Sequence, residues 1–366
     1  MRARWTHPSP PDSGAADDAG RHNQGRPASS GLHGEDLGRG TALELPDDSG
    51  GALATCRRLT RADDRFARER KVPFSGPAAL GSRTPTSPSG GVTRASCRPA
   101  LQQYGPVMDL KLDGRVVIVT GGSSGIGLAT IERLAQEGAR VATCARRGGR
   151  LTAAVAHLDP DCVLALPCDV EDRQGCERFV DAVLTRFGRL DVLVNNAGRG
   201  RHGGIGDLTD ADWQAELGAK VFGVLNPTRA AIAYLAASDA PRIINISGGT
   251  AREPRGDLLA VGAARAAVSN LSRGLAAEYA PSGVLVNTVS LGVFATARAE
   301  ERHQRQAPEL PFDQWGESEA SSRGVQLGRL GRPDEAAVVI AFLASPLASY
   351  VTGATVDVSG GLSHAW

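Results

Sequence analysis

Short apolar segments alternate with longer amphipathic segments through the last two-thirds of the chain. The short segments are nearly continuous in Val, Ile, Leu and Ala, which is typical of strands buried on both faces of a parallel sheet. They predict strands over 116–120, 140–145, 163–167, 191–195, 242–246, 284–289 and 354–358. The segments between them predict helices over 126–137, 147–158, 172–187, 209–236, 258–280 and 333–344. This alternation predicts an α/β fold, a doubly wound parallel sheet in a single domain.

Two regions lack the pattern. Residues 1–107 hold 11 of the 21 prolines and no hydrophobic period, so we expect a disordered low-complexity tail. Because Met108 stands where the pattern begins, a non-native extension is an alternative origin of this tail. The domain then covers 108–366. Residues 298–325 interrupt the rhythm after the sixth strand, on the side where such sheets bind ligands, and we expect a lid there.

Composition excludes several classes of function. With 41 Lys and Arg against 40 Asp and Glu, the net charge of +1 gives no general attraction to nucleic acid. The apolar run at 336–344 is far shorter than the roughly 18 to 20 residues that cross a bilayer, so no membrane partner is expected. The six cysteines form no CxxC pair or His-paired metal spacing, so we predict no metal site and a cytoplasmic location.

A glycine-rich turn follows the first predicted strand and leads into the first predicted helix. Glycines allow a tight turn and a close approach of the backbone to a pyrophosphate, whose charge the helix N-terminus stabilises. The turn therefore predicts a dinucleotide site, with a turn that binds nothing as the alternative. The residues expected to hold the cofactor are Gly121, Ser123, Ser124, Gly125, Ile126 and Gly127.

Two arginines at the end of the second predicted strand indicate which nucleotide binds. An acidic residue there binds the ribose 2′-hydroxyl of NAD, whereas Arg accommodates the 2′-phosphate of NADP. Arg146 and Arg147 stand at this place, so NADP(H) is expected in preference to NAD(H). Solvated arginines at a helix start are the alternative.

Several motifs together resemble the classical type of the short-chain dehydrogenase/reductase family over 109–364. They are Thr120–Gly127, Cys168–Val170, Asn195–Gly198, Val286–Asn287, Gly331–Glu335 and Tyr350–Gly353. The resemblance implies that Asp169 and Val170 hold the adenine. It also implies that Asn196, Ala197 and Gly198 line the adenosine ribose, and that Gly292 and Thr296 close over the nicotinamide.

The catalytic Asn, Ser, Tyr and Lys of that family are all replaced. Counting along the matching segments, these four positions fall on Lys220, Gly248, Val261 and Arg265. None of the tyrosines 104, 234, 279 and 350 has Lys four residues later. Val has no proton to donate, and Arg, with a pKa above about 12, does not readily relay one. Arg265 still has hydrogen-bond donors, so we expect it to hold the nicotinamide ribose.

Lys220 is the first candidate for a replacement acid, because an ammonium close to Arg265 has its charged form disfavoured. A structural lysine is the alternative. Ser247, one residue before the vacant Ser position, is a candidate only if the strand has already become loop there. Arg252 and Arg255 follow, and with Lys220 and Arg265 they predict a cationic cleft for an anionic group. Solvated arginines are again the alternative.

These observations predict an NADP-dependent oxidoreductase of this family. Its substrate is a small carbonyl, alcohol or activated enone, and its proton relay is altered. One alternative is a catalytically inactive NADP-binding pseudoenzyme that serves as an assembly partner. Another is a lyase or isomerase on the same scaffold. The long amphipathic segments 209–236 and 258–280 resemble the helices that family members pair, so a homodimer or homotetramer is expected.

Overall fold

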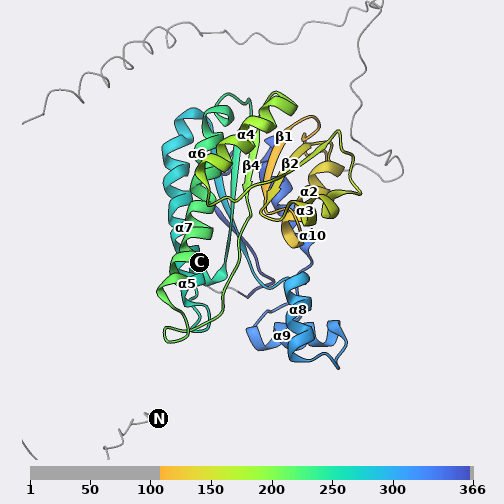
Figure 1. Cartoon of the computed structure of the whole chain (residues 1–366), viewed down its shortest axis with the longest axis vertical. Coiled ribbons are helices and arrows are strands. Elements are labelled where there is room, and N and C mark those ends of the chain that lie inside the picture. The colour runs from red at the N-terminus through yellow and green to blue at the C-terminus, as the bar shows by residue number, and fades with distance from the viewer. Residues whose placement is uncertain (1–107, 363–366) are drawn as a thin grey trace, which may run out of the picture. The chain divides into compact units, whose positions relative to one another are not determined.

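Seven parallel strands form one sheet in the computed structural model, which describes residues 108–362. The expectations for 1–107 lie outside the described residues. The strands are β1 (Val116–Thr120), β2 (Arg140–Ala145), β3 (Val163–Pro167), β4 (Val192–Asn195), β5 (Arg242–Gly248), β6 (Leu285–Leu291) and β7 (Thr355–Val358). Their order is β3-β2-β1-β4-β5-β6-β7 (Figure 1). The predicted doubly wound sheet is confirmed.

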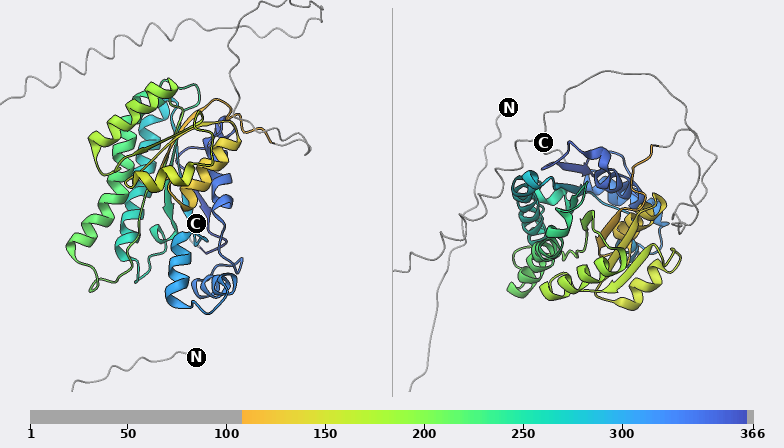
Figure 2. Two further views of the ribbon diagram at one scale, coloured as in Figure 1. Left: turned by 45° about the vertical axis from the view of Figure 1, so that its right-hand side comes forward. Right: turned by 90° about the horizontal axis from the view of Figure 1, so that it is seen from above.

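Helices cover both faces of this sheet (Figures 1 and 2). One face packs against α2 (Gly125–Gln136), α3 (Gly148–Val155) and α10 (Pro333–Ala344), through a core that includes Ile131, Leu134 and Ile340. The other face packs against α4 (Arg173–Phe187), α6 (Gly223–Leu235) and α7 (Leu259–Tyr279), through a core that includes Val183, Leu235 and Leu275. No helix within residues 108–362 is long and apolar enough to span a membrane.

The strand order reverses between β1 and β4. The chain runs outward from β1 through β2 to β3, then returns to pair β4 with the other side of β1. In open sheets of this kind, ligands bind outside the carboxyl ends of the strands at such a reversal. The glycine-rich turn after β1 and the loop after β4 therefore meet at the expected binding crevice.

The predicted helix 209–236 is divided in the structure. It consists of α5 (Asp210–Leu217), a π-helical turn (Gly218–Phe222) and α6. Such turns are rare and occur mostly as single bulges inside α-helices, so the amphipathic pattern predicted one continuous helix. Lys220 lies within this turn. The deviation thus coincides with one of the predicted catalytic positions.

Residues 298–325 are largely helical, which the sequence pattern did not predict. The segment contains α8 (Ala297–Gln306) and α9 (Phe312–Arg323), which lie beyond the sheet (Figure 1). Half of α8 consists of Arg and Glu, and it buries only Ala299 and His303. The two helices share a small core of their own, formed by Ala299, Trp315 and Leu330. So few residues of α8 are apolar that its helical pattern is carried mainly by charged side chains, which an apolar pattern does not register.

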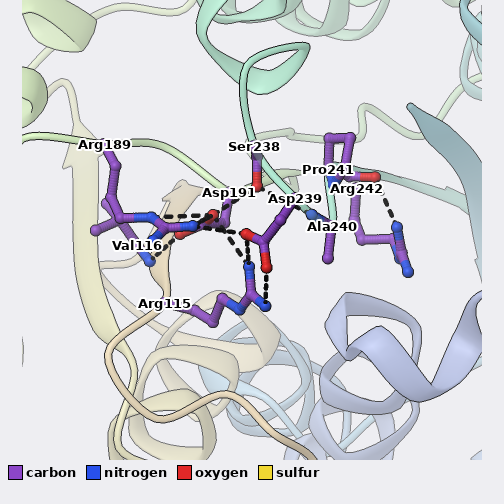
Figure 3. A network of polar contacts seen from close by, with 9 residues as sticks. All are labelled: Arg115, Val116, Arg189, Asp191, Ser238, Asp239, Ala240, Pro241 and Arg242. Atoms are coloured by element: carbon purple, nitrogen blue, oxygen red, sulfur yellow. Dashed lines mark hydrogen bonds and ion pairs between the residues drawn. The ribbon is translucent and has the colours of Figure 1, made fainter. Parts of the chain in front are cut away.

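A buried carboxylate ties the amino ends of the strands together (Figure 3). Asp191, immediately before β4, has a fully buried side chain and accepts hydrogen bonds from the Val116 amide at 2.9 Å and from Arg189 at 2.6 Å. Arg115 and Arg189 also bind Asp239, which is exposed. The network lies at the end of the sheet opposite the binding crevice, so its role is structural.

Candidate functional site

The glycine-rich turn packs directly against the loop that follows β4. A Cβ atom on Gly121 would lie 2.8 Å from the Cα of Ala197, and one on Gly127 would lie 2.4 Å from Nδ2 of Asn196. Gly121 and Gly125 also have positive φ angles of 76° and 58°, which L side chains rarely adopt. Glycine is therefore required at these positions.

The N-terminus of α2 provides the positive end of a helix at this turn. Its N-cap residue, Ser124, makes no side-chain capping hydrogen bond, and the first turn holds no acidic residue. The orphan N–H groups and the helix dipole at such a terminus favour a phosphate. The geometry thus fits the pyrophosphate of a dinucleotide.

Thr120 and Asn196 fix the two loops that face each other across the crevice. The Thr120 hydroxyl accepts hydrogen bonds from the backbone amides of Asn196 and Ala197, both at 3.0 Å. The Asn196 side chain donates to the carbonyl oxygens of Thr120 at 2.9 Å and Gly121 at 3.2 Å. These bonds hold the loop 196–198 beside the turn, where the resemblance expects the adenosine ribose.

The two arginines predicted to select NADP lie at the carboxyl end of β2. Both Arg146 and Arg147 are exposed, and neither side chain pairs with a carboxylate within residues 108–362. Arg147 is the N-cap residue of α3. Arg146 also lines a pocket of about 610 Å³, with Cys168, Asp169 and Phe179. Unpaired guanidinium groups beside an open pocket are available to an anionic group.

The other end of the crevice is closed by the segment after β6. Thr296 begins α8, and its Cγ2 would lie 3.3 Å from a Cβ atom placed on Gly125. Gly292 packs so closely on Ser359 that a Cβ atom would lie 2.7 Å from the Cα of Ser359. The structure therefore brings Thr296 to the glycine-rich turn, on the side where the nicotinamide is expected.

Lys220 is buried at the predicted catalytic position. Its ammonium forms an ion pair with Glu216, one helical turn earlier, and donates a hydrogen bond to the carbonyl oxygen of Arg199. Burial lowers the pKa of Lys220, while Glu216 opposes this shift and the positive charges of Arg265 and Arg298 add to it. The ammonium is therefore a stronger acid than an exposed lysine.

The guanidinium of Arg265 fills the space beside Gly248. A Cβ atom on Gly248 would lie 2.1 Å from Nη1 of Arg265 and 2.6 Å from its Cζ. Nη1 donates a hydrogen bond to the Thr250 hydroxyl at 3.3 Å. The guanidinium is held deep in the site, and burial lowers the pKa of Arg265. Gly248 and Arg265 therefore depend on each other, because the guanidinium of Arg265 occupies the space that a side chain at position 248 would fill.

Val261 is the residue that we predict at the position of the family's tyrosine. It is buried, and its Cγ2 would lie 3.6 Å from a Cβ atom on Gly200, in the loop after β4. The site therefore has an apolar wall at this point.

Ser247 was a catalytic candidate only if the strand had already become loop at this residue, and the structure does not meet that condition. The strand β5 continues through Gly248, so Ser247 is still in strand conformation. Its hydroxyl donates to the Arg265 carbonyl oxygen at 3.3 Å and lies 3.2 Å from the Ser269 hydroxyl, both on α7. These contacts anchor α7 to the sheet.

The predicted cationic cleft has different members in the structure. Arg252 pairs with Asp357 at 3.6 Å and Arg255 pairs with Asp257 at 3.1 Å, so carboxylates neutralise both side chains. Arg298, in the first turn of α8, instead contributes positive charge to Lys220 and Arg265. Sequence reasoning missed Arg298, because nothing along the chain brings α8 to this place.

Glu216 is the other residue that sequence reasoning missed. Its side chain is 2% exposed, and it is the carboxylate that pairs with Lys220. The i,i+4 spacing on one helix was a signal for this pair. Within residues 108–362, no group of three or more His, Cys, Asp or Glu is placed to hold a metal ion.

The family profile described as short chain dehydrogenase matches residues 115–307. The chain belongs to this family. Among curated relatives, the 3-oxoacyl-[acyl-carrier-protein] reductase of Thermotoga maritima is 33% identical over 255 residues, which cover 69% of this chain and 99% of that protein. This short-chain dehydrogenase therefore matches an oxidoreductase over nearly the whole length of that protein. Members of the family bind nicotinamide cofactors.

Solved structures are similar over the same region. A short-chain oxidoreductase from Pseudomonas aeruginosa, described as containing an atypical catalytic center, is 43% identical with a TM-score of 0.68, covering 70% of this chain and 99% of that one. Its NADPH-bound form is 42% identical with a TM-score of 0.65, covering 69% and 98%. L-sorbose reductase from Gluconobacter frateurii, complexed with NADPH and L-sorbose, is 30% identical with a TM-score of 0.66, covering 71% and 100%.

Proposed function

We propose that this short-chain dehydrogenase is an NADP(H)-dependent oxidoreductase that reduces the carbonyl of a small molecule and uses Lys220 in place of the family's tyrosine. The observation that carries the proposal is the combination of a glycine-rich nucleotide cradle with a buried lysine that is paired with Glu216. Bound NADPH supplies the hydride for such a reaction. The protein's own residues must then bind the carbonyl and donate a proton.

The preference for NADP(H) rests on Arg146 and Arg147. Both are exposed at the end of β2, where the resemblance places the adenosine ribose 2′-substituent. Arginine presents several donors in a rigid fork that suits phosphate. The NADPH-bound structures of the Pseudomonas aeruginosa oxidoreductase and L-sorbose reductase support this assignment.

Lys220 is the proposed proton donor. Of its three ammonium protons, one is donated to Glu216 and one to the carbonyl oxygen of Arg199. The third has no acceptor within residues 108–362, so a substrate oxygen can receive it. Because burial lowers its pKa, Lys220 gives up this proton more easily than a solvated lysine does.

The rest of the classical tetrad is also replaced in this proposal. Arg265 holds the nicotinamide ribose, Gly248 leaves room for its guanidinium, and Val261 provides an apolar wall without a proton donor. The related Pseudomonas aeruginosa protein is described as having an atypical catalytic center, which supports such a departure in this branch of the family.

The charge of the site favours an anionic carbonyl compound. Lys220, Arg265 and Arg298 act on one another at the crevice, with Glu216 as the carboxylate that faces them. The excess positive charge suits a substrate that carries a carboxylate, phosphate or sulfonate. We propose that the α8–α9 segment covers this substrate as a lid, and that the protein assembles as a homodimer or homotetramer.

The test begins with calorimetric titration of NADPH and NADH. We expect NADPH to bind at least about tenfold more tightly, and the Arg146→Ala/Arg147→Ala variant to lose that preference. Arg150→Ala, an exposed arginine on the same helix α3, is the matched control. The protein is then given NADPH and a panel of anionic and neutral aldehydes, ketones and enones.

Each outcome of this test has a distinct meaning. The proposal is supported if NADPH is consumed, and is consumed faster with the anionic carbonyls than with the neutral ones. Binding of NADPH with no consumption above background favours the pseudoenzyme. Product formation without a change in NADPH absorbance favours a lyase or isomerase.

A further inference from the structure

Three buried cysteines meet next to the pocket at the ends of β2 and β3. Cys144 lies in β2, Cys168 follows β3 directly, and Cys176 lies in the first turn of α4. All three are free thiols. The thiols of Cys168 and Cys176 both donate to the carbonyl oxygen of Asp169, at 3.6 and 3.9 Å, so these two sulfurs lie close to each other.

Cys168 differs from its two neighbours in access. Cys144 is 1% exposed and Cys176 is 2% exposed, whereas Cys168 is 9% exposed and lines the 610 Å³ pocket together with Arg146 and Asp169. A small oxidant that enters this pocket reaches Cys168 first. Hydrogen bonding with the neighbouring thiols lowers the pKa of Cys168, against burial and the carboxylates of Asp169 and Asp172, and the thiolate is the form of cysteine that attacks peroxides.

We propose that Cys168 is a peroxide-sensitive modification site whose oxidised form is captured by Cys176. The Cys168 thiolate attacks hydrogen peroxide, the O–O bond breaks, and with one proton the products are a sulfenic acid and water. The Cys176 thiol then attacks the sulfenic sulfur, an S–S bond forms and a second water leaves. In total, two thiols are oxidised and one peroxide is reduced to two waters.

Cys176 is better placed than Cys144 to be the partner. Cys144 is held in the middle of the sheet, where it pairs with Thr120 of β1 and Leu166 of β3. Cys176 instead borders the loop that follows Cys168, since its Sγ lies 3.6 Å from the carbonyl oxygen of Val170. A loop can adjust to form a disulfide more easily than a central strand can.

The disulfide would alter the adenine end of the proposed cofactor site, a consequence that rests on the proposed function. A disulfide holds its sulfurs at about 2.05 Å, much closer than hydrogen-bonded thiols, so it draws Cys168 toward α4. Asp169 and Val170, which the resemblance expects to hold the adenine, follow Cys168 directly. Oxidation should therefore weaken NADPH binding, and by linkage NADPH should protect Cys168 from oxidation.

The test treats the full-length protein with hydrogen peroxide, with and without NADPH, and maps the cysteines by mass spectrometry. We expect a Cys168–Cys176 disulfide, reversal by a thiol reductant, and an NADPH affinity about tenfold weaker in the oxidised protein. The Cys176→Ala variant should stop at a sulfenic acid on Cys168, which a dimedone reagent traps. Cys144→Ala, a neighbouring buried thiol of the same cluster, is the matched control and should still form the disulfide.

Two results would overturn the proposal. The first is that Cys168 of the folded protein stays reduced under a peroxide treatment that oxidises the cysteines of the unfolded protein. The second is a disulfide between Cys168 and Cys144. Mapping of the unaltered protein requires no variant to fold. If the reduced protein does not bind NADPH at all, the proposed function fails, but the oxidation map still decides the modification site.

Discussion

The replacement of Gly248 by alanine tests whether this glycine and Arg265 form one unit. The new Cβ atom would lie 2.1 Å from Nη1 and 2.6 Å from Cζ of Arg265, and 3.1 Å from the carbonyl oxygen of Leu291. The Leu291 oxygen belongs to the backbone of β6 and does not move readily. The guanidinium must therefore move, by about 1 Å or more, before these contacts become ordinary.

The expected cost has two parts. Forcing an extra carbon into a packed site destabilises a protein by about 1–3 kcal/mol. Loss of a hydrogen bond from a charged donor costs about 1.5–3 kcal/mol, so NADPH should bind about 10- to 100-fold more weakly if Arg265 holds the ribose. Lysine at position 265 has no fork, so Gly248→Ala combined with Arg265→Lys should cost less than the sum of the single changes.

The assay is a double-mutant cycle in which urea unfolding and NADPH titration are measured for all four proteins. Gly274→Ala is the matched control, because it lies on the same helix as Arg265 and a Cβ atom there meets nothing within 4 Å. This control should keep its NADPH affinity and gain a few tenths of a kcal/mol to about 1 kcal/mol of stability. Additive penalties, or unchanged NADPH affinity in Gly248→Ala, would refute the coupling.

Three further predictions follow from other parts of the structure. Because burial lowers the pKa of Lys220 below 10.5, the rate of reduction should fall as the pH rises through that lowered pKa. The free energy of unfolding should rise between the lowered pKa and 10.5, because the unfolded chain binds more protons in that range. A rate that stays constant up to pH 10.5 would argue against Lys220 as the donor. Asp191→Asn should destabilise the fold by about 3 kcal/mol in urea, and Asp239→Asn, whose side chain is 67% exposed, by about 1 kcal/mol or less; equal losses would contradict the structural role given to burial. Trp315→Ala should raise KM for the carbonyl substrate and speed proteolysis within α8–α9, while the melting temperature of the sheet domain stays within a few degrees. Unchanged proteolysis would show that the proposed lid does not depend on this small core.

The sheet and its covering helices could be predicted from the sequence because their signals are local. The strands are continuous apolar runs, and the strand-turn-helix arrangement around Gly121 fixes the place of the glycine-rich turn. The ends of most elements shifted by no more than three residues: β6 runs to Leu291 instead of 289, and α3 ends at Val155 instead of 158.

The candidate site was less predictable, because its members come from distant elements. The four positions expected for the tetrad could be counted along the chain, but the contact between Gly248 and Arg265 depends on the packing of α7 against β5. Arg298 joins the site from α8, an element with too few apolar residues to be predicted from the apolar pattern. The π-helical turn that holds Lys220 is a rare form within helices, so the amphipathic pattern predicted a continuous helix instead.

The most direct test of the central claim is the rate of NADPH consumption with an anionic carbonyl substrate. We compare the unaltered protein with the Lys220→Met/Glu216→Gln variant, in which neither partner of the buried ion pair is left as an unpaired charge. We expect a rate at least about 100-fold lower in the variant, with NADPH affinity within about twofold. Equal rates in the two proteins, or no consumption by the unaltered protein with any carbonyl of the panel, would contradict the central claim.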